Sequence, residues 1–305
     1  MRRVRYDSPG GPLFLEEAPV PEPGPGELLV RCEAVGVTLP VVRKVTEAAE
    51  PVPLGGEIAG EVVAVGTDVT RFRTGDRVTG LCFTHGYADY APLNSDMASP
   101  VPDYASAVDA VTLVRSGLVA LGALAAAQPE PGETALVTAA ASGVGQLAVQ
   151  LARARGAARV VGAVSDPAKA DFVRSLGADA VVVYGDDGWG EPVDYVLDAV
   201  GGDLLAPALA ALTPGGRLVA YSSGGGTIRA YDLLVGAKSV IGFQMARIAR
   251  TRPELCERWR QELWRMFADG TLKPAVHGVF ALEEAAEAHE VIESRSNLGK
   301  VLLRP

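Results

Sequence analysis

The sequence predicts an α/β protein in which a doubly wound parallel sheet follows a smaller β-rich domain. Three observations lead to this fold class. The chain has 305 residues, more than one small domain usually holds. Residues 13–103 alternate short β-rich segments with turn signals. The middle of the chain then alternates apolar strands with helices, which is the pattern of a parallel sheet covered by helices.

The β-rich stretch contains strand segments separated by glycine and proline turns. Glu27–Arg31, Glu61–Gly66 and Asp76–Gly80 are rich in the residues that strands favour. Pro-Gly-Pro-Gly at 23–26 and Arg-Thr-Gly-Asp at 73–76 are turns of the kind that link strands in a small barrel. This stretch is therefore predicted to form a compact β domain.

The middle stretch begins after a predicted helix at 105–127, which ends before Pro129 and Pro131. Helices are expected at 143–155, closed by Gly156, after the cap Asp166, and at 204–212. The predicted strands are Thr134–Thr138, Arg159–Val164, Ala180–Tyr184, Tyr195–Val200, Arg217–Tyr221 and Ser239–Phe243. Right-handed crossovers between such strands give the strand order of nucleotide-binding sheets.

The last stretch carries two predicted helices, at 253–268 and 282–294, and a terminal strand at 299–303. It lacks the pattern of an independent domain and is expected to pack back on the β-rich domain. The predicted division is thus a first domain over 1–107, a nucleotide-binding domain over 108–245 and a return segment over 246–305.

Composition and charge exclude several classes of function. The net charge is −9 and no segment concentrates Lys and Arg, whereas nucleic-acid binding needs a basic surface. No uninterrupted run of about 18 apolar residues predicts a membrane span, and the basic N-terminus lacks the apolar core of a signal peptide. The three cysteines and three histidines are not at metal-ligand spacing. We expect a soluble, cytoplasmic protein without a metal site.

The clearest chemical motif is Val-Thr-Ala-Ala-Ala-Ser-Gly-Val-Gly at 137–145, which joins a predicted strand to a predicted helix. Small residues let the backbone approach a pyrophosphate, and the helix N-terminus offers N–H groups to it. A tight strand-to-helix turn without a ligand is the alternative, since the usual first two glycines are absent. The candidate cofactor contacts are Ala140, Ser142, Gly143, Val144 and Gly145.

The end of the second predicted strand indicates which dinucleotide binds. An NAD site places a carboxylate there to hold the ribose hydroxyls. Here Ser165, Lys169 and Tyr184 could converge on a 2′-phosphate, which favours NADPH. The alternatives are that Lys169 is a solvated helix residue and that Asp166, instead of only capping the helix, serves a ribose.

Several motifs in one order resemble a known superfamily over nearly the full chain. They are Pro19-x-Pro21-x-Pro23-Gly24-Pro25-Gly26-Glu27-x-Leu29-Val30, Ala34-Val35-Gly36-Val37, Gly56-Glu57-Ile58-Ala59-Gly60-Glu61-Val62, Gly75-Asp76-Arg77-Val78, Ser175-Leu176-Gly177-Ala178-Asp179 and Asp198-x-Val200-Gly201-Gly202. The chain resembles the medium-chain dehydrogenase/reductase superfamily. The turn at 139–145 is similar to that of its zinc-independent quinone oxidoreductase-like branch.

The resemblance implies a GroES-like β-barrel catalytic domain built from both chain ends, with a Rossmann domain inserted between them. It implies substrate binding in a cleft between the two domains, and a homodimer paired through the strand at 239–243. Zinc-dependent relatives have ligands where this chain has Thr38 and Gly56, so a catalytic zinc is not expected.

The implied activity is hydride transfer from NADPH to a quinone or an α,β-unsaturated carbonyl. Candidate hydrogen-bond donors for the developing oxyanion are Thr38, Arg43 and Tyr87, with His85 a weaker candidate. Each has a structural alternative, such as Thr38 bonding local backbone. An enoyl-thioester or biosynthetic tailoring reductase is a second hypothesis, and a non-catalytic NADPH-binding structural or sensing protein is a third.

The resemblance also adds cofactor contacts beyond the glycine-containing turn. Ser222 and Ser223 follow the fifth predicted strand and are expected to line the path toward the nicotinamide. Backbone near Phe243 is expected at the carboxamide end. Asn297 and Lys300 resemble a C-terminal contact to the cofactor.

Overall fold

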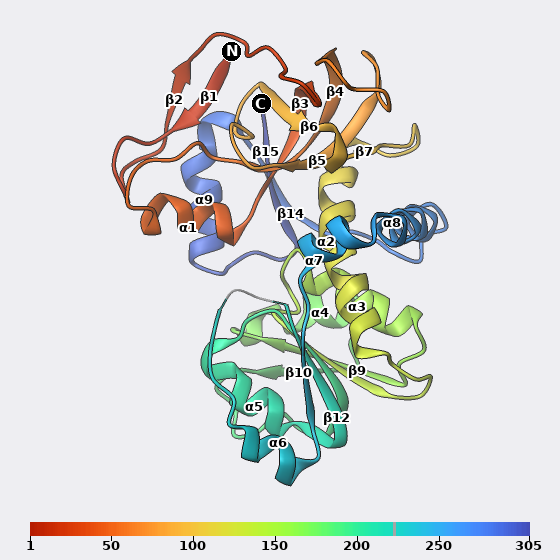
Figure 1. The fold of residues 1–305 in the computed structure, drawn as a ribbon. Coiled ribbons are helices and arrows are strands. Elements are labelled where there is room, and N and C mark those ends of the chain that lie inside the picture. The colour runs from red at the N-terminus through yellow and green to blue at the C-terminus, as the bar shows by residue number, and fades with distance from the viewer. Residues whose placement is uncertain (222–223) are drawn as a thin grey trace. The chain divides into compact units, whose positions relative to one another are not determined.

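The computed structural model of the chain describes residues 1–221 and 224–305, and the chain divides into two compact units. Unit 1 consists of Met1–Arg115 and Val276–Pro305, so both termini lie in it (Figure 1). Unit 2 consists of Ser116–Ala275. The predicted α/β fold class is confirmed.

Unit 1 is built on a mixed sheet with the strand order β14-β15-β3-β4-β5-β7, in which β6 also pairs with β3, while β1 and β2 form a separate two-stranded sheet. Its strands are β1 (Arg2–Arg5), β2 (Phe14–Glu17), β3 (Glu27–Val37), β4 (Gly56–Val65), β5 (Arg77–Cys82), β6 (Tyr90–Asn94), β7 (Ala98–Pro100), β14 (Val276–Ala281) and β15 (Lys300–Arg304). Its helices are α1 (Leu39–Glu47) and α9 (Ala285–Glu293), and it includes the start of α2 (Ala107–Ala127).

The two ends of the chain meet in the sheet of unit 1. Strand β15 pairs antiparallel with β3, with Val301 opposite Val37 and Leu303 opposite Val35. These side chains are buried in one apolar core with residues of β3 and β4 such as Val30 and Ile58. Strand β3 therefore lies between neighbours from distant parts of the sequence, β4 on one side and β15 on the other.

Unit 2 is built on a parallel sheet with the strand order β10-β9-β8-β11-β12-β13 (Figure 1). This is the order of dinucleotide-binding sheets: successive strands are added on one side of β8 up to β10, and from β11 onward on its other side. Its strands are β8 (Thr134–Thr138), β9 (Arg159–Val164), β10 (Ala180–Val183), β11 (Val193–Asp198), β12 (Leu212–Ala220) and β13 (Ser239–Gly242). Its helices are α3 (Gly145–Ala154), α4 (Ala170–Ser175), α5 (Leu205–Ala210), α6 (Ala230–Gly236), α7 (Met245–Thr251) and α8 (Pro253–Ala268).

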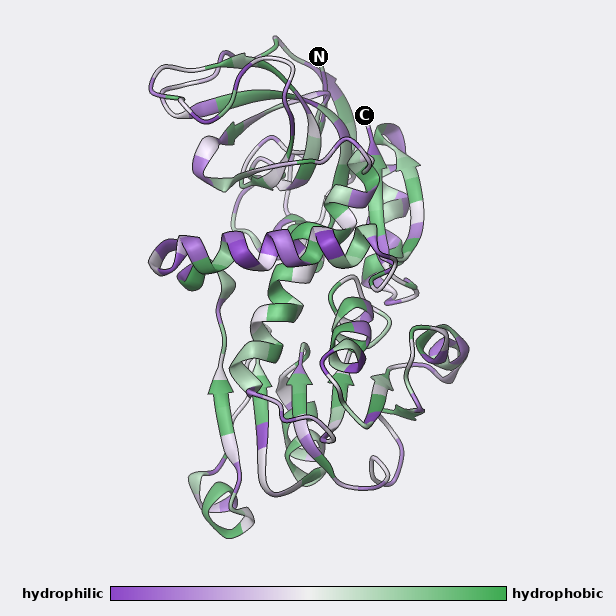
Figure 2. Cartoon of the chain, turned by 90° about the vertical axis from the view of Figure 1, so that its right-hand side faces the viewer, coloured by the Kyte–Doolittle hydropathy of each residue, from purple (hydrophilic) through white to green (hydrophobic). Residues whose placement is uncertain are grey.

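The strands in the middle of the unit 2 sheet are apolar and buried, and helices such as α3 and α5 pack on them. Figure 2 shows them as mostly hydrophobic, and residues such as Leu136, Val161 and Val196 are fully buried. All these strands run in one direction, so their carboxyl ends lie along one edge of the sheet. The turns that follow β8, β9, β11 and β12 lie along that edge, where ligands of doubly wound sheets bind.

The boundary between the units differs from the sequence-based division. Residues 246–275 were expected to return to the first domain, but they belong to unit 2, and only 276–305 belong to unit 1. The reason is that α8 packs on α2. A Cβ atom on Gly117 would lie 2.8 Å from a methyl carbon of Leu263, and one on Gly122 would lie 3.1 Å from the Trp259 ring.

Helix α1 was not among the elements predicted from the sequence. Pro40 occupies its first turn, where a missing N–H has no cost. Val41, Val42 and Val45 form its buried face.

Helix α2 is the one helix in the described ranges that is long and apolar enough to cross a membrane, judged by length and composition alone. In its most apolar window, 72% of the residues are buried inside the structure. Such burial is typical of a core helix in a folded protein.

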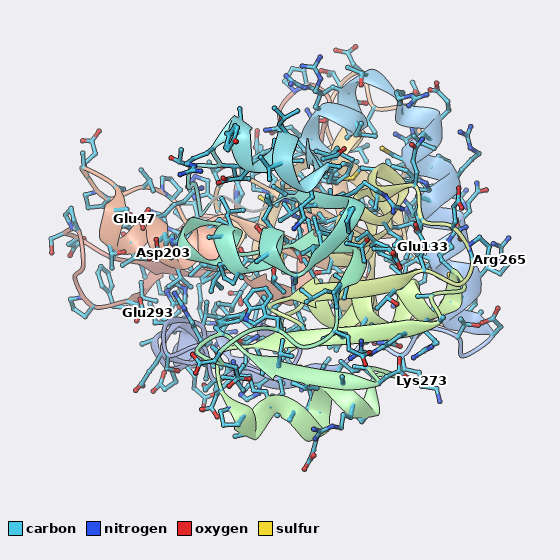
Figure 3. All side chains as sticks on the ribbon, turned by 90° about the horizontal axis from the view of Figure 1, so that it is seen from below. Glu47, Glu133, Asp203, Arg265, Lys273 and Glu293 are labelled. Carbon is cyan, nitrogen blue, oxygen red and sulfur yellow. The ribbon has the colours of Figure 1, made fainter. Side chains whose placement is uncertain are left out.

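Two glutamines of α3 hold the segment that leads from unit 2 to unit 1. Gln146 accepts a hydrogen bond from the N–H of Ala275 at 2.9 Å, and its amide donates to the Ala275 carbonyl at 3.4 Å. Gln150 makes the same pair of bonds with the Lys273 backbone, at 2.9 and 3.2 Å. The Lys273 side chain points away from the molecule (Figure 3). The segment is therefore fixed through its backbone on the helix that begins at the 137–145 turn.

Candidate dinucleotide-binding and active site

The turn after β8 is a compact, internally bonded loop. Ala139 has a φ of +48°, a left-handed conformation that is uncommon for alanine. The Ser142 N–H donates to the Ala139 carbonyl at 2.9 Å, and the Ser142 hydroxyl accepts the N–H of Gly145 at 3.0 Å. The predicted connection from strand to helix is present, and α3 begins at Gly145.

Gly145 is the position in this turn that requires glycine. A Cβ atom there would lie 2.0 Å from the Ala139 carbonyl oxygen and 2.9 Å from the Ala140 Cα atom. Both contacts are with backbone, which cannot move aside as a flexible side chain can. The helix can therefore approach the turn this closely only without a side chain at Gly145.

The start of α3 fits a phosphate group. In the described part of the chain, no protein group accepts a hydrogen bond from the N–H of Gly143 or of Val144, and both residues are half-buried. These N–H groups precede a ten-residue helix whose dipole favours an anion at this end. The turn therefore fits the pyrophosphate of a dinucleotide.

The end of β9 brings together two of the predicted 2′-phosphate contacts. The Lys169 ammonium lies 3.1 Å from the Ser165 hydroxyl. Asp166 uses its carboxylate to accept the N–H of Ala168 at 2.8 Å, which confirms its prediction as a helix cap. A capping carboxylate is less available to a ribose, so this edge carries a cation and a hydroxyl beside β9.

Tyr184 reaches from the end of β10 to the phosphate turn. Its N–H donates to the Val164 carbonyl at 3.0 Å, which places it beside β9. Its hydroxyl accepts the N–H of Ala139 at 2.7 Å. Tyr184 was predicted to converge with Ser165 and Lys169, and the structure gives its hydroxyl a partner in the turn itself. The left-handed conformation of Ala139 is thus stabilised by a side chain from two strands away.

A buried carboxylate links the ends of β8 and β11. Asp198 is inaccessible to solvent and accepts hydrogen bonds from the Thr138 hydroxyl at 2.9 Å and the Gly201 N–H at 2.9 Å. The Thr138 hydroxyl accepts in turn the N–H of Ala199 at 2.8 Å. Asp198 belongs to a motif noted in the sequence, but its partners were not predicted. It fixes the loop after β11 relative to the phosphate turn.

The other predicted cofactor contacts are not all in unit 2. The Phe243 N–H donates to the Ala220 carbonyl at 2.9 Å, and its ring packs against α2 at Gly122. The Asn297 amide donates to the Gly299 carbonyl at 3.0 Å within unit 1. Ser222 and Ser223 lie outside the described residues.

The predicted donors Thr38 and Arg43 both belong to α1. Thr38 is the N-cap residue, and its side chain makes no capping hydrogen bond. The Arg43 side chain is 37% exposed, and its Nε atom lies 3.5 Å from a Glu47 carboxylate oxygen. The structure therefore leaves the Thr38 hydroxyl outside the helix hydrogen bonds and the Arg43 guanidinium partly solvated.

Tyr87, the third predicted donor, lies inside the core of unit 1. Its side chain is 1% exposed, and its hydroxyl is 3.2 Å from Nε2 of the buried His289. The two rings pack edge to face with centroids 5.6 Å apart. Burial raises the pKa of Tyr87 and lowers the pKa of His289 to about 4. His85, two residues before Tyr87, has a φ of +57° and lies in a bend of the chain.

We predict that His289 makes the protein acid-sensitive. The unfolded chain binds a proton at this histidine below pH 6.5, whereas the folded protein binds it only near pH 4. The contribution of neutral His289 to the unfolding free energy is therefore fully present above pH 6.5. It falls as the pH decreases, and about 3 kcal/mol is lost at pH 4. Chemical denaturation between pH 7.5 and 4 measures this loss. A His289→Gln variant should lose less stability over the same range, and an equal loss in both proteins would contradict the assignment.

A buried charge cluster in unit 1 was missed by the sequence analysis. The Glu57 carboxylate bonds the Lys300 ammonium, and both residues are about 5% exposed or less. Its other oxygen lies 3.3 Å from Nε of Arg115. Lys300 was expected to contact the cofactor, but here its ammonium pairs with Glu57 in the sheet of unit 1. Glu57 on β4 and Lys300 on β15 meet only because both strands pair with β3. The sequence around either residue does not reveal this contact.

Metal-ligating side chains do not cluster in the described residues: no group of three or more His, Cys, Asp or Glu residues there could hold a metal ion. Cys32, Cys82 and Cys256 are buried free thiols.

Comparison with known proteins decides the family. Residues 24–103 match the alcohol dehydrogenase GroES-like domain, and residues 143–267 match the zinc-binding dehydrogenase family. A quinone oxidoreductase of Pseudomonas aeruginosa is 32% identical over 326 residues, which cover 100% of this chain and 99% of the relative. The chain belongs to the quinone oxidoreductase-like branch of the medium-chain dehydrogenase/reductase superfamily. The predicted resemblance is confirmed.

Other medium-chain dehydrogenase/reductases extend this likeness. The structure of Escherichia coli quinone oxidoreductase complexed with NADPH superposes with a TM-score of 0.89 and 28% identity, over 100% of both chains. An acryloyl-coenzyme A reductase of Metallosphaera sedula is 31% identical over 329 residues, covering 95% of this chain and 95% of the relative. Members of the superfamily with similar sequences are thus named for different acceptors.

Proposed function

We propose that this protein is an NADPH-dependent oxidoreductase that reduces a quinone or an α,β-unsaturated carbonyl without a catalytic zinc. The observation that carries the proposal is the unit 2 edge, where a phosphate-compatible turn lies beside the Ser165–Lys169 pair. The NADPH-bound relative supports the same cofactor. Bound NADPH would supply the hydride for the reduction.

The residues of unit 2 have distinct roles in this proposal. Gly143 and Val144 donate backbone N–H groups to the pyrophosphate, and Ala140, Ser142 and Gly145 keep the turn narrow. Lys169 supplies the counter-charge for the 2′-phosphate, and Ser165 a hydroxyl. Tyr184 holds the turn in place, and Ser222, Ser223, Phe243 and Asn297 remain proposed contacts to the rest of the cofactor.

In unit 1, the Thr38 hydroxyl or the Arg43 guanidinium is proposed to donate a hydrogen bond to the oxygen that becomes negative during reduction. Thr38 caps α1 and Arg43 lies on it, and Leu39, next to Thr38, is 41% exposed. Tyr87 is a weaker proposal, because its hydroxyl would have to leave His289. Thr38 and Gly56 stand where zinc-dependent relatives have ligands, which supports the zinc-independent assignment.

The proposal predicts a preference for NADPH over NADH. A charge-assisted hydrogen bond to the 2′-phosphate should lower the Kd for NADPH about ten- to a hundredfold relative to NADH. Titration of purified protein with both cofactors measures this ratio. Lys169→Ala should bring the ratio close to one, while Arg174→Ala, which removes a cation of the neighbouring helix α4, should leave it unchanged. Equal binding of NADH and NADPH by the unaltered protein would contradict the proposal.

The acceptor class is tested by NADPH oxidation with quinones, enones and short enoyl thioesters. Turnover with quinones or enones supports the proposed reaction. Turnover restricted to enoyl thioesters supports the second candidate, a thioester reductase, which the Metallosphaera relative favours. Tight NADPH binding without turnover of any class would favour a binding role instead.

We also propose a cytoplasmic homodimer that acts on a small molecule and needs neither nucleic acid nor a membrane. Three buried free thiols suit a reducing compartment. Strand β13 lies at one edge of the unit 2 sheet. The preceding helix α6 exposes Tyr231, Leu234 and Val235 by 65%, 76% and 68%. An apolar helix face beside an open strand edge supports pairing with a second copy of the chain.

A further inference from the structure

Two tyrosine hydroxyls among the described residues of unit 2 are buried without a hydrogen-bond partner. They belong to Tyr195 and Tyr221. A buried hydroxyl without a partner destabilises a folded protein, because it has lost its bonds to water and gained none. Each of these two therefore requires an explanation.

The burial of Tyr195 is explained by the contacts of its aromatic ring. It lies near the amino end of β11, with Ala135 and Arg217 as its neighbours in the adjacent strands. The Arg217 guanidinium lies over the ring, 5.7 Å from its centroid, and is itself bonded to Glu133 at 2.7 Å. The aromatic face is thus in use, and the hydroxyl lies far from the carboxyl edge where the turns lie.

Tyr221 lies at the opposite end of the same sheet. It follows the last residue of β12, and its N–H donates to the Asp198 carbonyl at 3.1 Å. The Asp198 carboxylate next to it is already occupied by the Thr138 hydroxyl and by loop N–H groups. The Tyr221 hydroxyl is therefore left without a hydrogen-bond partner among the described residues.

The surroundings of Tyr221 keep its hydroxyl protonated. Burial raises the pKa of Tyr221, and the charges of Asp198 and Tyr184 raise it further. Tyr184 approaches the phosphate turn from the β10 side, where its hydroxyl bonds Ala139. The two phenols thus flank the carboxyl end of β8 from opposite directions, and Tyr221 is a hydrogen-bond donor at neutral pH.

The order of the strands determines which part of a dinucleotide Tyr221 faces. Ser165 and Lys169, at the end of β9, are assigned to the adenosine half, and the turn after β8 to the pyrophosphate. Strands β11 and β12 lie on the other side of β8. The remaining half of the cofactor, the nicotinamide nucleotide, therefore lies on the side of Tyr221.

We propose that the Tyr221 hydroxyl donates a hydrogen bond to a ribose or phosphate oxygen of the nicotinamide nucleotide half of NADPH. This inference rests on the proposed function, since it adds a binding residue to the same site. The hydroxyl is then unsatisfied only when the cofactor is absent, and binding restores its hydrogen bond.

The test compares Tyr221→Phe with Tyr195→Phe, which removes an equally buried and unpaired hydroxyl at the other end of the sheet. Thermal unfolding without cofactor should show both variants at least as stable as the unaltered protein. Tyr221→Phe should raise the Kd for NADPH about tenfold. It should leave the Kd for adenosine 2′,5′-bisphosphate unchanged, because that probe lacks the nicotinamide half. Tyr195→Phe should leave both Kd values unchanged.

Two kinds of failure are distinguishable. If the unaltered protein binds NADPH but Tyr221→Phe binds it equally well, or weakens both probes equally, the inference is wrong while the proposed function stands. A lower unfolding temperature of Tyr221→Phe would also overturn it, since the hydroxyl would then have a protein partner. If the unaltered protein binds neither probe, the proposed function fails and this inference with it.

Discussion

The Lys300→Met variant is expected to lose about 3 kcal/mol of unfolding free energy, because it leaves the buried Glu57 carboxylate with only the partly exposed Arg115 guanidinium as a partner. Glu57 is 5% exposed and Lys300 4% exposed, so water cannot replace the lost contact. Gly36 shows how tightly this site is packed: a Cβ there would lie 3.0 Å from the Lys300 Cε atom. Denaturant-induced unfolding measures the loss.

A surface pair on the same strand provides the control. Glu61, like Glu57, belongs to β4, and it pairs with Arg31 at 2.5 Å with side chains that are 36% and 52% exposed. Arg31→Met should therefore change stability by less than about 1 kcal/mol. The double variant Glu57→Leu with Lys300→Met should recover much of the loss, since no charge is then buried alone. If Lys300→Met lost no more unfolding free energy than Arg31→Met, the buried pair would stabilise the protein no more than a surface pair does.

The Gly145→Ala variant is expected to weaken NADPH binding by about a hundredfold, because the phosphate turn must move to admit a methyl group. The Cβ would lie 2.0 Å from the Ala139 carbonyl oxygen, and relief of that contact displaces the N–H groups of Gly143 and Val144. Overpacking should also lower the unfolding free energy by about 1–3 kcal/mol. Isothermal titration with NADPH and thermal unfolding measure the two effects separately.

Gly185→Ala is the matched control for this substitution. Gly185 follows Tyr184 in the same unit, and a Cβ there would meet no atom within 4 Å. We expect its NADPH affinity and stability to stay close to those of the unaltered protein. If Gly145→Ala bound NADPH as tightly as Gly185→Ala, the turn would not be the pyrophosphate site.

Most of the fold of unit 2 was predictable because its signals are local. The strands Thr134–Thr138 and Arg159–Val164 and the helix Pro253–Ala268 have the predicted bounds, since apolar runs there end at clear turn or capping residues. The capping role of Asp166 also follows from its position before Pro167. By contrast, the assignment of 246–275 depended on which surface α8 covers, and its own sequence does not specify that.

The candidate site was predictable only where it is built from neighbouring residues. The turn at 137–145 and the Ser165–Lys169 pair are separated by few residues and were found. The Tyr87–His289 contact joins residues 202 positions apart, and Glu57–Lys300 joins residues 243 apart. Such pairs arise from strand pairing and packing, so the sequence read alone did not reveal these partners of Tyr87 and Lys300.

The pairing of β15 with β3 determines the order in which the chain can fold during synthesis. Unit 2 is one continuous segment, Ser116–Ala275, and it is synthesised before β15, at Lys300–Arg304. Domains fold as units once their sequence is available, so the nucleotide-binding half can fold early. Until β15 has been made, β3 lacks one of its neighbouring strands, and Glu57 lacks its partner Lys300. The whole segment of the cofactor-binding unit is thus synthesised before the sheet of the other unit can be completed.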